Sequence, residues 1–253
     1  MPEIAPEWLV PEWPAPPGVS AVSTLRIGGQ SQAPYDGWNL AQHVGDVPAA
    51  VAHNRRLLRQ ALSLRYEPLW LQQVHGVQVV RAGDSVARTD APPEADASIA
   101  SGASPPCVVL TADCLPVLFC AQNGSEVAAA HAGWRGLAAG ILERTVASFA
   151  TPAGELLAWL GPAIGPASFE VGAEVRARFV DADAAAANAF DPHGPRFMAD
   201  LYALARQRLV GAGIRAGAIY GGTRCTFSEP THFFSYRRQG TCGRMATLIW
   251  IAS

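Results

Sequence analysis

The chain has 253 residues, of which 49% are hydrophobic and 16% charged, and its formal net charge is −2. This near-neutral balance argues against a nucleic-acid platform or a polybasic membrane anchor, and no apolar run approaches the roughly 20 residues of a membrane helix. The acidic, proline-rich residues 1–7 do not form a signal-peptide pattern, and the five cysteines include no C-x-x-C pair. We therefore expect a cytoplasmic globular protein that binds neither nucleic acid nor membrane.

Residues 1–18 predict an extended N-terminal arm, and residues 19–253 predict a single domain, because strands and helices alternate there without a break in composition. Asp46 is the predicted cap of a helix with Pro48 in its first turn. Residues 82–105 are acidic and rich in Ala and Pro, which predicts a loop. The strands predicted in this first part are Val19–Ile27, Leu69–Gln73 and Val77–Arg81.

The second part of the chain opens with a long apolar run, Cys107–Cys120, interrupted by Thr-Ala-Asp-Cys-Leu-Pro, which predicts one buried strand broken by a bulge or kink at Pro116. A strand at Val127–Ala130 is followed by a helix marked by Leu137, Ile141, Thr145 and Phe149. The remaining predictions are strands at Leu156–Leu160, Ala216–Tyr220 and Met245–Ile251, and helices at 171–180 and 200–212, the second capped by Asp200.

Three short motifs each offer one metal-binding side chain where a strand-like run meets Gly or Pro. His75 precedes Gly76, Cys114 lies two residues before Pro116, and His131 precedes Ala-Gly. Two imidazoles and one thiolate form a three-ligand zinc set, and a set with a free fourth position indicates catalysis more than structure. Taken singly, each residue fits an ordinary structural role, and spacing alone leaves a shared site open because it does not establish proximity.

Arginines provide the other unusual pattern. Arg135 follows His131 by four positions at a predicted helix start, where it is either a solvated residue or a fork for phosphate or carboxylate. The stretch Phe233–Arg244 concentrates three arginines beside aromatic residues, which favours an anion partner. Spacing does not rank these arginines.

Together these motifs resemble the YfiH/LACC1 family, also called the laccase-domain or polyphenol oxidase family, over nearly all of the chain after the arm. The resemblance rests on Asn39-Leu40, His43-Val44-Gly45-Asp46, Asn54-Arg55, Gln73-Val74-His75-Gly76, Ala112–Pro116, His131–Gly136, Gly161–Pro166, Phe169–Gly172 and Phe233–Arg238. One departure is Cys242, where relatives often carry threonine before Gly-Arg.

The resemblance implies an α+β fold in a layered α/β/β/α arrangement with mixed sheets, and a zinc ion held by His75, Cys114 and His131. It implies phosphorolysis of adenosine, inosine, guanosine or methylthioadenosine, and hydrolytic deamination of adenosine. The expected catalytic residues are Asp113, Cys114, His131 and Arg135. The expected substrate- or phosphate-binding residues are Asn39, His43, Arg55, Gln73, Tyr236, Arg237 and Arg238. Asp113 is either a proton shuttle or a structural hydrogen-bonding residue.

Three other functions use the same residues. The first is a copper-dependent phenol oxidase, since a His₂Cys set can bind copper, but a laccase-type trinuclear cluster consumes more imidazoles than the six here. Copper bound in vitro would follow from its higher intrinsic affinity. Cys114 with His131 as base would give a cysteine hydrolase acting on amides, for example in editing cell-wall precursors. A binding module would use zinc only to stabilise its fold. Dependence of turnover on metal separates these alternatives.

Overall fold

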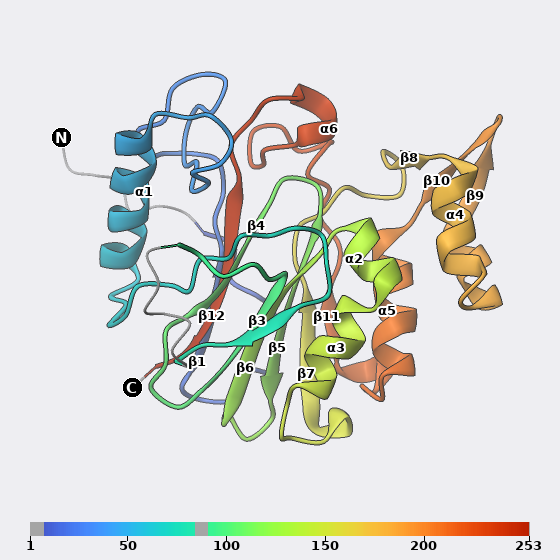
Figure 1. The fold of residues 1–253 in the computed structure, drawn as a ribbon, viewed down its shortest axis with the longest axis horizontal. Helices are drawn as coiled ribbons and strands as arrows, with labels where there is room; N and C mark the ends of the chain where they lie inside the picture. The colour runs from blue at the N-terminus through green and yellow to red at the C-terminus, as the bar shows by residue number, and fades with distance from the viewer. Residues whose placement is uncertain (1–7, 84–90, 253) are drawn as a thin grey trace.

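The computed structural model describes residues 8–83 and 91–252, so residues 1–7 of the predicted arm and 84–90 of the predicted loop lie outside the described residues. Figure 1 shows the fold. The helices are α1 (Pro48–Ala61), α2 (Trp134–Ala139), α3 (Ile141–Ala147), α4 (Ala173–Val180), α5 (Leu201–Gly211) and α6 (Tyr236–Gln239), with short 3₁₀ turns at Ala153–Glu155, Ala184–Ala189 and Ala216–Ala218. The strands are β1 (Val19–Ser23), β2 (Val79–Arg81), β3 (Ala97–Ser101), β4 (Cys107–Thr111), β5 (Leu115–Ala121), β6 (Glu126–Ala132), β7 (Leu156–Leu160), β8 (Glu170–Val171), β9 (Phe190–His193), β10 (Arg196–Ala199), β11 (Ile219–Gly221) and β12 (Met245–Ile251).

The strands form one large and two small sheets. The large sheet has the order β11-β7-β5-β6-β3-β2, and it is mixed because β11–β7 and β2–β3 are parallel while the other pairs are antiparallel. An antiparallel sheet β1-β12-β4 packs on it, and a third sheet, β8-β10-β9, projects to one side (Figure 1). The expected α+β class with mixed sheets is confirmed.

Alternation of side chains along β4 explains the layering. Val109 contributes to the core shared with the large sheet, whereas Val108 and Leu110 pack with Leu58 of α1 in a second core. Because successive residues of a strand point to opposite faces, an unbroken apolar strand is buried on both sides. The helix α1 therefore covers one outer face, and α3 and α5 cover the opposite one (Figure 1). The layers are α/β/β/α, as expected.

Most predicted elements are present, and the structure corrects several of them. The run at Cys107–Cys120 is two strands, β4 and β5, which belong to different sheets. Leu69–Gln73 forms only isolated bridges, and the first strand ends at Ser23. Asp46 does not cap α1: its carboxylate accepts from Asn39 and from the Val47 N–H, although Pro48 does begin the helix.

The predicted loop 82–105 is wrong in its second half, where Ala97–Ser101 is the buried strand β3. The sequence does not predict β3, because Ala and Ser have little strand propensity. Burial between β2 and β6 stabilises this strand instead. The helix after β6 is two helices, α2 and α3, that meet at Gly140, whose φ of +99° ends the first. Asp200 caps α5 as predicted, accepting from the Tyr202 and Ala203 N–H groups.

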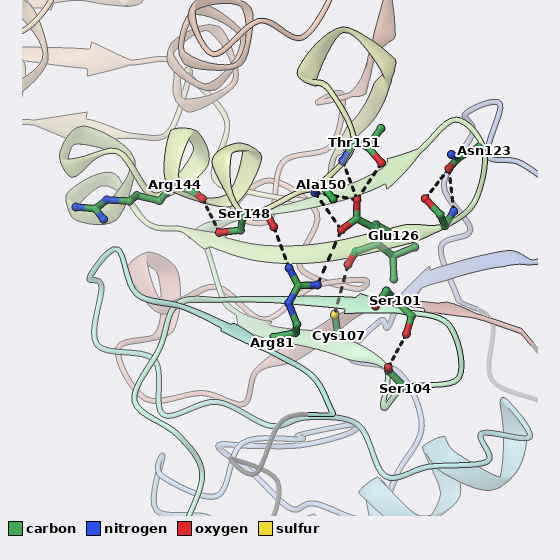
Figure 2. Close-up of polar contacts among 12 residues, drawn as sticks. Arg81, Ser101, Ser104, Cys107, Asn123, Glu126, Arg144, Ser148, Ala150 and Thr151 are labelled. Atoms are coloured by element: carbon green, nitrogen blue, oxygen red, sulfur yellow. Dashed lines mark hydrogen bonds and ion pairs between the residues drawn. The ribbon is translucent and has the colours of Figure 1, made fainter.

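One end of the large sheet is fastened by a buried acid, Glu126, at the start of β6 (Figure 2). Its carboxylate accepts from the Ala150 and Thr151 N–H groups at 3.0 and 2.9 Å and from the Thr151 hydroxyl at 2.9 Å, with Arg81 at 3.9 Å. These donors satisfy the charge, so Glu126 is a structural residue. Among the described residues, none of the helices has the length and apolar character required to cross a bilayer.

Candidate metal centre

The three predicted ligands meet in space. Cys114 lies in the turn from β4 to β5, His131 is the penultimate residue of β6, and His75 lies in a turn before β2. All their ligand atoms lie within 4.8 Å of one another, and the Cys114 Sγ is 3.8 Å from the His75 Nε2. The register explains part of this: Pro116 pairs with His131, which brings the start of β5 beside the end of β6.

Two of the turns have left-handed backbone. His75 has φ of +61° and Asp113, beside Cys114, has φ of +93°. Such values are uncommon outside glycine and require compensation by the surroundings. The chain must turn sharply at Asp113 because β4 and β5 belong to different sheets. Backbone constraint and metal-binding residues therefore coincide.

Asp96 supplies the compensation at His75. This fully buried carboxylate, just before β3, accepts from the backbone N–H groups of His75 at 2.9 Å and Gly76 at 2.6 Å, and of Val74 at 3.2 Å. Its Oδ1 also accepts from the His131 Nδ1 at 2.8 Å. Asp96 thus holds both the turn that carries His75 and the ring of His131. Its bond to Nδ1 leaves the Nε2 of His131 for a metal.

The electrostatics favour a thiolate at Cys114. Burial by itself raises the pKa of this thiol, but the charge and hydrogen bonding of His131, with a smaller contribution from His75, lower it to about 6. Burial likewise opposes a charged His131, yet the Cys114 thiolate and Asp96 raise the pKa of that ring to about 9. Burial also works against an ionised Asp96, and the hydrogen bonds from His131 and Gly76 prevail and lower its pKa. A thiolate is the form in which cysteine binds metals.

Glycine at position 133 leaves room for an ion. A Cβ there would lie 2.9 Å from the His75 Cδ2, 3.0 Å from the Cys114 Sγ and 3.5 Å from the His131 Cε1. The donor set, its orientation by Asp96 and this open side together fit a bound metal. Within residues 8–83 and 91–252, no other group of three His, Cys, Asp or Glu side chains has this arrangement.

A Gly133→Ala variant is expected to bind zinc about 10- to 100-fold more weakly, since overpacking of this kind costs about 1–3 kcal/mol. The backbone at Gly133 has φ of −59°, so alanine meets only the ligand side chains and no backbone strain. Competition with a chromophoric chelator measures the affinity. Gly154→Ala is the matched control, because nothing lies within 4 Å of its added Cβ. Equal zinc affinity in the Gly133→Ala variant and the native chain would contradict this geometry.

The Asp113 carboxylate joins two distant segments. Its Oδ1 accepts from the Thr226 hydroxyl at 2.6 Å, and its Oδ2 accepts from the Arg237 N–H at 2.6 Å. Both oxygens have partners, which suits the structural role among the two roles expected for Asp113. Arg237 in turn donates to the Glu170 carbonyl, so α6 is held beside the Cys114 turn.

Three of the expected substrate-binding residues use their side chains within the fold. The Asn39 amide bonds Ala41, Asp46 and the Arg244 N–H. Gln73 exchanges two hydrogen bonds with the Leu110 backbone, at 2.8 and 2.7 Å. Arg238 donates to three backbone carbonyls, those of Thr226, Phe227 and Phe233. They position the neighbourhood of the site.

The other expected residues are more accessible. Tyr236, at the start of α6, is 59% exposed, and Arg135 is exposed with its guanidinium over the Trp134 ring at 4.4 Å. His43 and Arg55 lie near each other, since the charge of Arg55 acts on the His43 ring. The expected residues thus divide between a metal centre, a supporting network and exposed polar groups.

Asp96 is the functional residue that the sequence reasoning missed. It lies in the stretch predicted as loop, and acids are common there. The available signal was its place, directly before the run of mostly small residues Ala97–Ala100. An acid directly before a buried strand is either exposed to solvent or buried with hydrogen-bond partners. Only the fold shows which of these environments the acid has.

The comparisons with known proteins agree with this architecture. The family model described as multi-copper polyphenol oxidoreductase laccase matches residues 20–252. Purine nucleoside phosphorylase YfiH of Escherichia coli strain K12 is 54% identical over 244 residues, covering 96% of this chain and 98% of the relative. Purine nucleoside phosphorylase PA4543 of Pseudomonas aeruginosa is 55% identical over 247 residues, with the same two coverages.

Solved structures show the same fold. The Neisseria meningitidis protein NMB0706 has a TM-score of 0.91 and 47% identity, covering 97% of this chain and 99% of that chain. A Bacillus licheniformis hypothetical protein YfiH has a TM-score of 0.87 and 29% identity, covering 92% of each chain.

Proposed function

Because the chain belongs to the multi-copper polyphenol oxidoreductase laccase family, and relatives at 54–55% identity are named purine nucleoside phosphorylases, we propose that it is a zinc-dependent purine nucleoside phosphorylase. Its proposed substrates are adenosine, inosine, guanosine and methylthioadenosine, and it also deaminates adenosine. The observation that carries the proposal is the His75–Cys114–His131 group, with His131 oriented by Asp96. The five cysteines are free, which suits the reducing cytoplasm as its location.

In phosphorolysis a phosphate oxygen forms a bond to C1′ of the ribose while the bond from C1′ to the purine nitrogen breaks, and the purine takes up a proton. The transition state is oxocarbenium-like and leaves charge on the base. In deamination the oxygen of water bonds to C6 and nitrogen leaves as ammonia. Zinc, when bound, supplies Lewis acidity.

The residues of the chain would act by holding and orienting. His75, Cys114 and His131 would hold the zinc, and Asp96 keeps the proton of His131 on Nδ1. Tyr236 offers an exposed aromatic face to a purine beside this centre, because its neighbour Arg237 is bonded to Asp113. Asp113 acts in this proposal as a positioning residue.

The test is chromatography of adenosine incubated with the purified protein, with and without phosphate. Phosphate-dependent adenine together with ribose 1-phosphate is the expected product of phosphorolysis, and inosine is that of deamination. A Cys114→Ala protein purified in the same way controls for contaminating host enzymes. Equal product from both proteins, or none from either, would overturn the proposal.

The geometry also favours a second candidate, the cysteine hydrolase. Asp96, His131 and Cys114 form a chain in which the carboxylate bonds the imidazole at 2.8 Å and the imidazole lowers the pKa of the thiol to about 6. This arrangement needs neither zinc nor His75. Turnover of amides in the presence of a chelator would favour it.

A multi-copper oxidase is less consistent with the described residues. His53, His193 and His232 pair with Arg56, Glu170 and Glu229, and none belongs to a second three-ligand group in the described part of the chain. A trinuclear copper cluster would require such imidazoles to converge.

A further inference from the structure

Three basic side chains from separate segments lie near one another. They are His43 in the loop 39–46, Arg55 on α1, and Arg244 just before β12. The charges of Arg244 and Arg55 both act on the His43 ring, adding to its desolvation in lowering the pKa of that histidine. The Arg55 guanidinium stacks on the Trp70 ring at 3.8 Å. We define His43, Arg55 and Arg244 as the basic cluster.

A single hydrogen-bonded network fixes the basic cluster. The Asn39 side chain closes the loop around His43 by donating to Asp46 at 2.8 Å, and it accepts from the Arg244 N–H at 2.9 Å. The neighbouring Leu40 carbonyl accepts from the Arg55 Nε at 2.9 Å. Asn39 and Leu40 thus set the relative positions of all three basic residues.

The charges of the basic cluster lack an ion-pair partner. Within the described residues, no carboxylate lies within 4.0 Å of either guanidinium, and the Glu67 that acts on Arg55 is bonded to the Trp70 Nε1 at 2.7 Å. Desolvation lowers the pKa of Arg55 to about 10. Both terminal nitrogens of Arg55 and the Nη2 of Arg244 have no hydrogen-bond partner in the described part of the chain. None of these nitrogens is among the buried atoms without a partner, so they are open to solvent and free to donate to an anion.

The basic cluster lies on the same side of the molecule as the metal centre. The Arg237 N–H on α6 donates to Asp113, which precedes the ligand Cys114, and Met245, which follows Arg244, pairs with Thr111 at the end of β4. The segment from α6 to Arg244 therefore borders both groups. Tyr236 on α6 lies over the Arg244 guanidinium at 5.7 Å. An anion at the basic cluster and a base beside Tyr236 would share one face.

We propose that His43, Arg55 and Arg244 form the subsite for the inorganic phosphate that attacks C1′, an inference that rests on the proposed function. Tetrahedral phosphate has several acceptor oxygens, which matches two guanidinium groups and an imidazole approaching from different segments.

The test compares Arg55→Met and Arg244→Met with the matched control Arg56→Met. The Arg56→Met variant also removes one positive charge from α1, but the Arg56 side chain is exposed and bonded to His53. Loss of one charge-assisted hydrogen-bonding group is expected to raise the KM for phosphate about 10- to 100-fold, with the KM for adenosine unchanged. Isothermal titration with inorganic phosphate is expected to show the same fold-loss in binding. Thermal unfolding identifies any variant that fails to fold, and the second variant then carries the test.

Two outcomes distinguish a wrong phosphate subsite from a wrong proposed function. If the wild-type protein binds no phosphate, or if both variants bind it as Arg56→Met does, the subsite is wrong, whatever the activity. If phosphate binds and both variants lose it, but the wild-type protein releases no purine base, the subsite stands and the proposed phosphorylase function fails.

Discussion

Replacing His75 by alanine is expected to remove the metal from the purified chain and to lower phosphorolysis by about 10³-fold or more, because a catalytic metal supplies several kcal/mol of transition-state stabilisation. His75 is the most exposed of the three ligands, and its imidazole lies 3.8 Å from the Cys114 sulfur. The other two ligands alone leave an open, weaker site. Elemental analysis of the purified variant, together with its rate of adenine release, checks both effects.

His193→Ala provides the control for this variant, because His193 is an exposed imidazole paired with Glu170 on the projecting sheet. It is expected to keep its metal and its rate. The His75→Ala variant also separates the two candidate mechanisms. The Cys114–His131–Asp96 hydrolase does not use His75, so retained turnover in this variant would contradict the metal mechanism and support the hydrolase.

Asp96→Asn is expected to weaken zinc binding about 10- to 100-fold, since partners that orient a ligand contribute this much to metal affinity. It is also expected to destabilise the fold by about 3 kcal/mol, because a buried carboxylate that accepts four hydrogen bonds is replaced by an amide whose NH₂ faces donors. The four donors are His131 and the N–H groups of residues 74–76. Zinc competition and chemical denaturation measure the two quantities.

Glu126→Gln is the matched control for Asp96→Asn. Glu126 is a second buried acid that accepts several hydrogen bonds (Figure 2). It begins β6, whereas His131 lies near the other end of that strand. It is about 16 Å from that ligand at the rise of an extended strand. Its replacement should cost comparable stability and leave zinc affinity unchanged. A loss of zinc affinity as large in Glu126→Gln as in Asp96→Asn would show that the effect follows from stability and not from orientation of His131.

The sequence predicts the metal ligands better than their setting. Local composition marks His75, Cys114 and His131, because each lies at a strand end beside Gly or Pro, and the structure brings all three together. Their proximity depends on strand pairing between β5 and β6 and on the turn that Asp96 holds. Neither contact is local at the site, since Pro116 and His131 are 15 positions apart and His75 and Asp96 are 21 positions apart.

The same reason explains the elements that were wrong. The run Cys107–Cys120 is apolar throughout, and periodicity does not show that the chain changes sheets at Asp113. The strand β3 is built from small residues and is stabilised by its neighbours. Asn39 and Gln73 belong to the motifs of the resemblance, yet the fold uses their amides to bond Asp46, Arg244 and Leu110. Motif membership does not distinguish a residue that contacts substrate from one that positions its neighbours.

The proposed function requires one zinc ion at His75, Cys114 and His131 for turnover of purine nucleosides. The most direct test strips the metal with a chelator, removes the chelator, and adds zinc back in steps while adenine release from adenosine and phosphate is followed. We expect no activity in the stripped protein and a linear rise in rate that ends at one zinc ion per chain. Full activity in the folded, metal-free protein would contradict it.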